Sequence, residues 1–286
     1  MRPDAFATCR PRLLGVAYAI LGELAESEDV VQDAWLRWQA ADRQEVLNAE
    51  AFLVTVTTRL AIDRRRSARA RRETYVGTWL PDPLVHDPDD PETLAIEAET
   101  VSLALLTALE CLNPVERAVL VLRDVFDIEY SAIADAIETS PANARQIAKR
   151  AREHAGDPTR RRPVNREEQE RLTVSFLLAA QQGDIDGLRA VLAADAIQYS
   201  DGGGKAGVAR RPIYGAEKIA SFYAGVRRTG RIPPDLSAHP VLVNGDPGVR
   251  LVGTSGERYA ITALQIVEGR VQAIRNFINP ERFGHL

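Results

Sequence analysis

Cysteine is scarce in this chain of 286 residues, since only Cys9 and Cys111 are present and neither lies in a CxxC pair. The scarcity argues against a disulfide framework or a zinc knot, and it predicts a reducing compartment. Long apolar runs are absent too, and a membrane-spanning helix needs about 18 or more such residues in succession. Arg2, Asp4 and Arg10 interrupt any apolar core of a signal peptide. These absences predict a cytoplasmic protein with no membrane partner.

The sequence also has little net charge, −4, which by itself argues weakly against a nucleic-acid partner. The distribution of the charges matters more than their sum. Seven arginines fall between Arg59 and Arg72, and a second basic run covers residues 145–152, whereas acidic residues collect at 23–33. Separate basic and acidic segments are typical of a protein with distinct DNA and protein partners.

Proline- and glycine-containing breaks divide the chain into three parts, in keeping with the two or three domains that its length predicts. We expect a helical domain over residues 1–73, a linker over 74–93, a second helical domain over 94–155, a short linker over 156–165 and a third domain over 166–286. The proline-rich acidic stretch at 81–92 marks the first linker, and Gly156, Pro158 and Pro163 mark the second.

The third domain mixes helical and strand patterns. Helices are expected at 166–182, 184–193 and 215–227. A short strand is expected at 196–200, and β-rich runs separated by Gly-containing turns follow at 239–244, 248–253, 257–267 and 270–279. This order predicts an α+β domain with an antiparallel sheet.

The first helical domain contains two segments of opposite charge. In residues 27–38, one apolar stripe is formed at helical spacing by Val30, Val31, Ala34, Trp35 and Trp38. A second helix is expected from Ala49 to Arg72, and its second half is a basic rod that no core could bury. Such runs are often only solvated helix ends. Here the few nearby acidic residues, such as Asp63, cannot offset seven guanidinium groups, and a polyanion would relieve their repulsion.

Residues 129–153 fit a helix-turn-helix, in which Glu138-Thr139 forms the turn and Ser140 caps the second helix. Apolar residues at i, i+3, i+4 and i+7 would pack the second helix on its partner; these are Ala144, Ile147, Ala148 and Ala151. Side chains able to reach base edges and phosphates point outward, namely Asn143, Arg145, Gln146, Lys149 and Arg150. An ordinary solvated helix is the alternative, but the capped turn and the basic excess together favour DNA binding.

The order of these features resembles that of extracytoplasmic-function (ECF) sigma factors. The stretch Ser27–Trp38 looks like their region 2 polymerase-binding helix, and the resemblance implies that Asp29, Gln32 and Asp33 grip a coiled coil on the largest subunit of core RNA polymerase. The stretch Ala51–Arg66 looks like the reader of the −10 element. By the same resemblance, the non-template strand is contacted by Asn48, Arg59, Asp63, Arg64, Arg65 and Arg66.

Region 4 of the same family is similar to the stretch that begins at Leu112-Asn-Pro-Val-Glu-Arg. The helix-turn-helix would then read the −35 element of promoter DNA, while the domain also meets the polymerase flap. The implied architecture is a multidomain chain. It has two all-α sigma domains, a region 2 helical bundle and a region 4 helix-turn-helix, followed by an α+β cone of the SnoaL-like (nuclear-transport-factor-like) type.

Three further motifs resemble a subgroup of this family, the SigJ type, which carries a fused C-terminal SnoaL-like domain. They are Trp79-Leu80-Pro81-Asp82-Pro83, the loop Asp201-Gly202-Gly203-Gly204-Lys205, and the terminal Asn279-Pro280-Glu281-Arg282-Phe283. Asp82 stands where the subgroup commonly has Glu, and the terminal motif departs from the usual Asp-Lys ending. The resemblance implies that these segments form regulatory contacts between the linker and the cone, with no separate anti-sigma factor required.

The role of the cone has three alternatives. It can be a built-in regulator of the sigma domains, a site for a small-molecule ligand, or an enzyme. An enzyme of this fold needs a carboxylate or His in its cavity, and the candidates are Asp195, Asp201 and His239. No acid–base pair stands out by spacing, so no catalytic residue, metal or cofactor is expected. A helix-turn-helix repressor with a ligand domain is the alternative for the whole chain, but it gives no reason for the acidic helix and the arginine rod.

Overall fold

The computed structural model describes residues 5–42, 46–88, 101–155, 166–204, 208–230, 233 and 235–279. It divides into two compact units, each assembled from two segments of the chain. The helical unit comprises 1–73 and 99–159, and the cone unit comprises 74–98 and 160–286. Among the described residues, no helix is long and apolar enough to span a bilayer.

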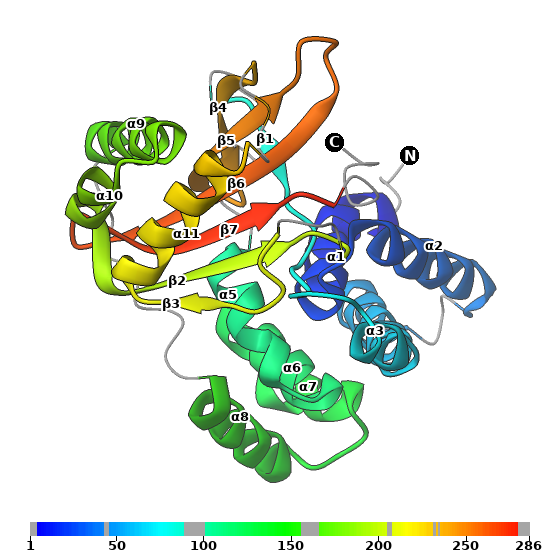
Figure 1. The fold of residues 1–286 in the computed structure, drawn as a ribbon. Helices are drawn as coiled ribbons and strands as arrows, with labels where there is room; N and C mark the ends of the chain where they lie inside the picture. The colour runs from blue at the N-terminus through cyan, green and yellow to red at the C-terminus, as the bar shows by residue number, and fades with distance from the viewer. Residues whose placement is uncertain are drawn as a thin grey trace. The chain divides into compact units, whose positions relative to one another are not determined.

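The first half of the helical unit is a bundle of α1 (Ala5–Leu21), α2 (Leu24–Ala40) and α3 (Ala49–Glu73) (Figure 1). Asn48 starts α3, because its Oδ1 accepts a hydrogen bond from the backbone N of Ala51 at 3.1 Å. The core of the bundle is apolar and includes the buried residues Leu13, Val16, Ile20, Val30 and Leu53.

The second half consists of α5 (Leu103–Ala108), the short turn η1 (Leu109–Cys111), α6 (Pro114–Leu120), the π-turn η2 (Val121–Val125), α7 (Tyr130–Ala136) and α8 (Pro141–Ala155). Asn113 and Glu116 form a capping box at the start of α6. Asn113 Oδ1 accepts hydrogen bonds from the backbone N atoms of Val115 and Glu116, each at 3.0 Å. Ser140 Oγ accepts from Asn143 N at 3.2 Å before α8. Both helix starts expected from the sequence are therefore confirmed.

The cone unit contains the helices α9 (Arg166–Gln182), α10 (Ile185–Val191) and α11 (Ala216–Arg228). Its strands are β1 (Val85–His86), β2 (Leu192–Asp201), β3 (Ile213–Tyr214), β4 (Ser237–Val243), β5 (Asp246–Val252), β6 (Arg258–Val267) and β7 (Arg270–Phe277). They form one sheet in the order β1-β4-β5-β6-β7-β2-β3. The α+β domain expected from the sequence for the last third of the chain is confirmed.

The antiparallel sheet expected from the sequence is found with one exception, because β2 and β7 pair in parallel. A parallel pair needs a long crossover, and α11 with four strands lies between these two in sequence. The other pairs are antiparallel. The turns at Asn244-Gly245 and Glu268-Gly269 place both residues at positive φ, between 51° and 77°, as a tight hairpin turn requires.

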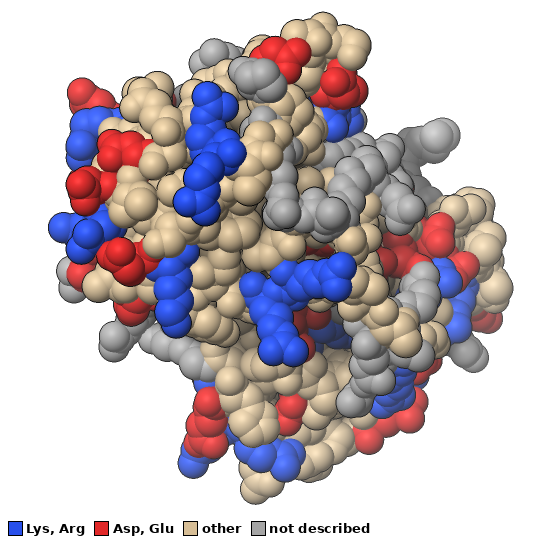
Figure 2. Space-filling view, in the orientation of Figure 1, with Lys and Arg blue, Asp and Glu red and all other residues tan. Residues whose placement is uncertain are grey.

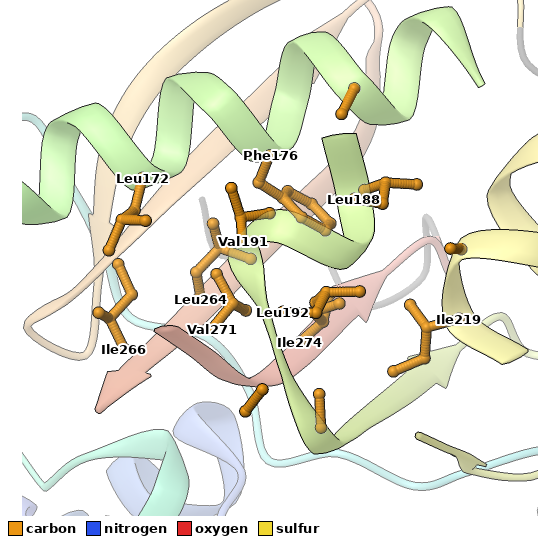
Figure 3. Packing of buried hydrophobic residues seen from close by; sticks show 14 residues of the cluster. Leu172, Phe176, Leu188, Val191, Leu192, Ile219, Leu264, Ile266, Val271 and Ile274 are labelled. Atoms are coloured by element: carbon orange, nitrogen blue, oxygen red, sulfur yellow. The ribbon is translucent and has the colours of Figure 1, made fainter. Parts of the chain in front are cut away.

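The core of the cone lies between its helices and one face of the sheet (Figures 1 and 3). Phe176 of α9 and Leu188 of α10 point toward Ile274 of β7, and Ile219 of α11 closes the same layer (Figure 3).

The segment that follows α3 belongs to the cone unit as an edge strand. Val85 of β1 pairs with Val243 of β4. The side-chain Oδ1 of the turn residue Asn244 accepts a hydrogen bond from the backbone N of Leu84 at 2.9 Å. The backbone N of Asn244 in turn donates to Leu84 O at 2.8 Å. Part of the expected linker is thus ordered by a partner far away in the sequence.

Candidate nucleic-acid interface and linker contacts

The outer face of α8 is polar and accessible. Ala144, Ile147, Ala148 and Ala151 are buried against α6 and α7, as the spacing predicted. The predicted DNA-contacting side chains are all exposed; they are Asn143, Arg145, Gln146, Lys149 and Arg150. Figure 2 shows basic and acidic side chains interspersed around α8. This part of the surface is therefore not one continuous basic patch.

Two arginines fix the position of α8 and its neighbouring turn. Arg152 binds the carboxylate of Asp124 through two nitrogens, at 2.9 and 2.5 Å, and this hydrogen bonding raises the pKa of Arg152 above its ordinary value. The guanidinium of Arg145 lies 5.3 Å from the ring centre of Tyr130, a cation–π distance. Arg145 is therefore preorganised at the outer face rather than fully extended into solvent.

The acidic helix α2 exposes the three side chains predicted to meet polymerase, Asp29, Gln32 and Asp33. Asp29 also lies 3.4 Å from Arg64 of α3, which pairs more closely with Glu26 at 3.0 Å. These pairs are partly exposed and weak, so they orient the carboxylates without neutralising the surface.

Trp35 was predicted to face the core of this bundle, and that prediction was wrong. Its relative exposure is 39%, and the neighbouring Leu36 is 52% exposed. The buried stripe is completed by Ser27, whose hydroxyl donates to Glu23 O at 2.5 Å. Successive residues of a helix are rotated by about 100° around its axis. With Ser27 included, the buried face of α2 is centred on the side of the helix away from Trp35. The acidic face therefore carries an exposed indole beside Gln32.

The arginines of α3 do not share one environment. Arg66 is exposed and pairs with Asp63 at 3.3 Å. Arg65 is only 6% exposed, which overturns the expectation that no core could bury this part of the helix. Its guanidinium donates to Leu21 O and to the carboxylate of Glu110, each at 3.2 Å. Arg65 is thus a structural residue in this arrangement, and the side chains of residues 69–73 lie outside the described part.

Glu110 holds a second buried arginine that the sequence reasoning missed. Arg117 of α6 is fully buried, binds Glu110 at 2.6 Å and donates to Ala19 O at 2.8 Å. Ala19 and Leu21 belong to the last turn of α1, whose carbonyl groups lack partners within the helix. The arginines supply those partners and join the two halves of the helical unit. The only sequence signal was an arginine on the apolar face of α6.

Arg59 makes a similar but more exposed contact between the halves. It donates to the carbonyl oxygens of Asp135 and Ala136, at 2.7 and 3.1 Å, where α7 ends. It also pairs with Glu138 at 3.3 Å. A cation is favoured at a helix C-terminus. Asn48, the other predicted −10 contact at this end of α3, is exposed and serves as the helix cap.

The predicted linker motif packs in the cone unit. Leu80, Pro81, Asp82 and Pro83 are buried, and Trp79 makes an edge-to-face contact with Tyr75, with ring centroids 4.9 Å apart. Tyr75 was not singled out from the sequence, yet it connects the other motifs.

Three polar side chains form what we call the linker clamp: Tyr75, Asp201 and Asn279. The Tyr75 hydroxyl donates to the carboxylate of Asp201, and Asn279 Nδ2 donates to Tyr75 Oη at 3.1 Å. The backbone N atoms of Ile278 and Asn279 donate to Asp201 O at 2.8 and 3.1 Å. Asp201 is fully buried, so the Tyr75 hydroxyl supplies a partner to a carboxylate that would otherwise be costly to bury, while the two backbone N atoms satisfy its main-chain carbonyl.

The glycine loop allows the clamp to close. A Cβ on Gly203 would lie 2.6 Å from the Asn279 side chain, and one on Gly202 would lie 2.7 Å from Val208. Gly203 and Gly204 also have positive φ, which other residues rarely adopt. The structure therefore brings the predicted Asp201–Gly204 loop, Asn279 and the linker together, whereas Lys205 and Pro280 lie outside the described residues.

The cone contains a cavity of about 440 Å³ between α9, α11 and the sheet. None of the described residues that line it is Asp, Glu, His, Lys or Cys. Asp195 is exposed and bonded to Gln272, Asp201 is in the clamp, and His239 is exposed beside Ser237. The three acid–base candidates are thus not brought together in the cavity. Across the described part of the chain, no cluster of metal-ligating side chains occurs, and both cysteines are free.

Comparisons with known proteins agree with this arrangement. Residues 5–71 match the family model Sigma-70 region 2, and residues 102–154 match Sigma-70, region 4. The chain is 37% identical to the ECF RNA polymerase sigma factor SigJ of Mycobacterium tuberculosis strain H37Rv, over 99% of this chain and 93% of the relative. It is 30% identical to the probable ECF RNA polymerase sigma factor SigI of strain CDC 1551, over 96% and 92%. The crystal structure of M. tuberculosis SigJ superposes with a TM-score of 0.77 at 32% identity, covering 98% of this chain and 97% of that one.

Proposed function

The chain belongs to the ECF sigma factors, which direct promoter-specific transcription initiation by RNA polymerase, and we propose that its SnoaL-like cone is a built-in regulator of that activity. The repressor alternative is displaced by this membership. The observation that carries the regulatory proposal is the linker clamp, because Tyr75 lies on the only covalent connection between region 2 and region 4.

The clamp shortens the reach of that connection. The −10 and −35 elements lie about 25 base pairs apart, which is roughly 85 Å along B-DNA at 3.4 Å per base pair. A fully extended chain from residue 74 to 102 would span roughly 100 Å, whereas the part beyond residue 88 alone would span roughly 50 Å. Holding residues 74–88 on the cone therefore limits how far region 4 can move from region 2.

The helical unit supports the same proposal, since its halves are joined while the protein is free. Arg59, a predicted −10 contact, is occupied by the end of α7. We propose that Asn48, Arg59, Asp63, Arg64 and Arg66 meet the non-template strand after the halves separate. Arg65 leaves this set unless opening also releases it from Glu110.

On the promoter, the exposed face of α8 would read the −35 duplex, with the side chains of Asn143, Arg145, Gln146, Lys149 and Arg150. Asp29, Gln32 and Asp33, with exposed Trp35 beside them, would grip the coiled coil of the largest polymerase subunit, and region 4 would meet the flap. We propose that this work at promoters takes place in the cytoplasm.

Because the restraint lies within the chain, we propose that no separate anti-sigma factor is required. We also propose that the cone is not an enzyme, since its cavity lacks an acid–base pair among the described residues.

Transcription by purified core polymerase from a cognate promoter tests the regulator. Tyr75→Phe removes the hydroxyl that bonds Asp201 and keeps the ring against Trp79. We expect transcription to rise by about tenfold or more, because a hydrogen bond to a charged group contributes about 1.5–3 kcal/mol to the closed form. Tyr214→Phe, at an exposed position of β3, is the matched control. Equal transcription from Tyr75→Phe and the parent, at equal binding to core polymerase, would reject the restraint.

A further inference from the structure

The cavity of the cone is mostly apolar but has a polar inner wall. Its apolar side comes from α9, α11 and the β5–β6 hairpin, through residues such as Phe176, Phe222 and Leu251. Its polar side comes from β6, β7 and α11, through Thr262, Asn276 and Tyr223. A volume of about 440 Å³ is within the range of small-molecule sites.

The three polar side chains form a directional chain of hydrogen bonds. Thr262 Oγ1 donates to Asn276 Oδ1 at 2.9 Å, and Asn276 Nδ2 donates to Tyr223 Oη at 3.2 Å. Thr262 and Asn276 are buried, at 8% and 7% exposure. Since the tyrosine oxygen accepts in this chain, its own hydrogen points onward and can be donated to a group inside the cavity.

The tyrosine is held in place and stays protonated. Its ring packs edge-to-face on Phe176, with centroids 5.6 Å apart. Burial raises the pKa of Tyr223 to about 12. The hydroxyl is therefore a fixed donor throughout the physiological pH range, and it matches an oxygen acceptor rather than a cation or a donor group.

We propose that this cavity binds an uncharged, largely apolar small molecule through a carbonyl oxygen that accepts a hydrogen bond from Tyr223. A carboxylate ligand would find no buried cation among the described lining residues. The one arginine among them, Arg227, is exposed at the end of α11. Burying an unpaired carboxylate in such a pocket would be costly, whereas a ketone or similar carbonyl needs only the one donor.

The site adjoins the clamp. Ile278 lines the cavity and also donates its backbone N to Asp201 O, and the next residue, Asn279, bonds Tyr75. Resting on the proposed regulator function, we infer that occupancy of the cavity shifts Ile278 and so biases the clamp. Binding itself is measured without polymerase, so failure of the site and failure of the regulator are distinguishable.

A neutral dialkylamino-naphthyl ketone dye is a suitable probe, and its fluorescence anisotropy gives a dissociation constant with the purified full chain. We expect saturable binding that Tyr223→Phe weakens by about 5- to 10-fold, the effect of one hydrogen bond. Tyr214→Phe, which changes an exposed tyrosine outside the cavity, should leave the constant unchanged. Ala180→Leu fills the cavity from α9 and should abolish binding, as a second variant independent of the hydroxyl.

Competition identifies the ligand class. Acetylnaphthalene should displace the dye, and naphthoate, its anionic counterpart, should displace it at least tenfold less well. Equal affinity for the parent and Tyr223→Phe, equal competition by the two naphthalenes, or absence of saturable binding would each overturn the proposal. A change in promoter transcription on adding acetylnaphthalene, lost in Tyr223→Phe, supports the coupling to the clamp, and its absence with binding intact rejects only that coupling.

Discussion

The helical unit and the cone unit both join segments that are distant in sequence, but they use different chemistry. In the helical unit, arginine side chains reach across to carbonyl oxygens and carboxylates, as Arg59, Arg65 and Arg117 do. In the cone unit, a backbone strand pair and the clamp of Tyr75, Asp201 and Asn279 hold the linker. Arg59 is the exposed member of this junction, so its ion pair should respond to salt and competing polyanions, whereas the buried arginines and the backbone pairing should respond far less. The two junctions should therefore differ in how strongly salt affects them.

The buried part of the first junction gives the largest expected effect. Arg117→Ala leaves Glu110 without its closest partner and empties a fully buried site. We expect the helical unit to lose about 3–5 kcal/mol of unfolding free energy, as when one partner of a buried ion pair is removed. Urea unfolding followed by circular dichroism measures this.

Arg66→Ala is the matched control, because that side chain is exposed, and its effect should be within about 0.5 kcal/mol. A similarly small loss for Arg117→Ala would mean that the arginine cluster does not join the halves.

The strand junction gives the next effect, at Asn244. This residue has a φ of 52° and bonds Leu84 through both its side chain and its backbone N. Asn244→Ala should destabilise the cone unit by about 2–3 kcal/mol, through left-handed strain together with a lost hydrogen bond.

Asn244→Gly keeps the left-handed conformation accessible and removes only the side-chain bond, so we expect about 1 kcal/mol. Thermal unfolding of the two variants separates backbone strain from the bond to β1. If both variants unfold at the same temperature as the parent, the pairing of β1 with β4 does not contribute to the stability of the cone unit.

The exposed part of the first junction gives a smaller effect. A double-mutant cycle of Arg59→Ala and Glu138→Ala should give a coupling of about 0.2–1 kcal/mol, since both side chains are well exposed. The coupling should shrink as salt is raised from low to high concentration. A coupling that is insensitive to salt would contradict the distinction between the two junctions.

The smallest effect is expected on α8, which takes no part in either junction through its outer face. Lys149→Ala should lower the affinity of the polymerase holoenzyme for every promoter alike, by a few-fold, and reduce the salt slope by about one if the lysine meets a phosphate. Arg145→Ala should instead relax specificity at one position if it meets a base. Filter binding to matched promoter variants measures both, and parent-like binding by both would show that this face does not contact DNA.

Local signals predicted the elements well, and long-range contacts escaped them. The caps at Asn113 and Ser140 and the Asn244-Gly245 turn are encoded within a few residues, so the helix starts and the hairpin were predictable. The burial of Arg65 depends on Glu110, and the parallel pairing of β2 with β7 depends on a long crossover. The spacing of apolar residues along a single segment does not show which distant residue that segment will contact.

The candidate sites divide in the same way. Helical periodicity placed Lys149 and Arg145 on the outer face of α8, because that face is a local property. The clamp was foreseen through the resemblance of its motifs, yet Tyr75 was missed, since a lone tyrosine in a proline-rich stretch carries no local signal.

The pairing of β1 with β4 has a consequence for how the protein is made. Leu84 and Asn244 are 160 residues apart, and a ribosome adding roughly 5–20 residues per second needs about 8–32 s to pass from one to the other. During that interval the helical domains have emerged and the first strand has no partner. Each newly synthesised molecule therefore passes through a period in which β1 has been made and its partner strand has not, so the pairing of the linker with the cone can form only late in synthesis.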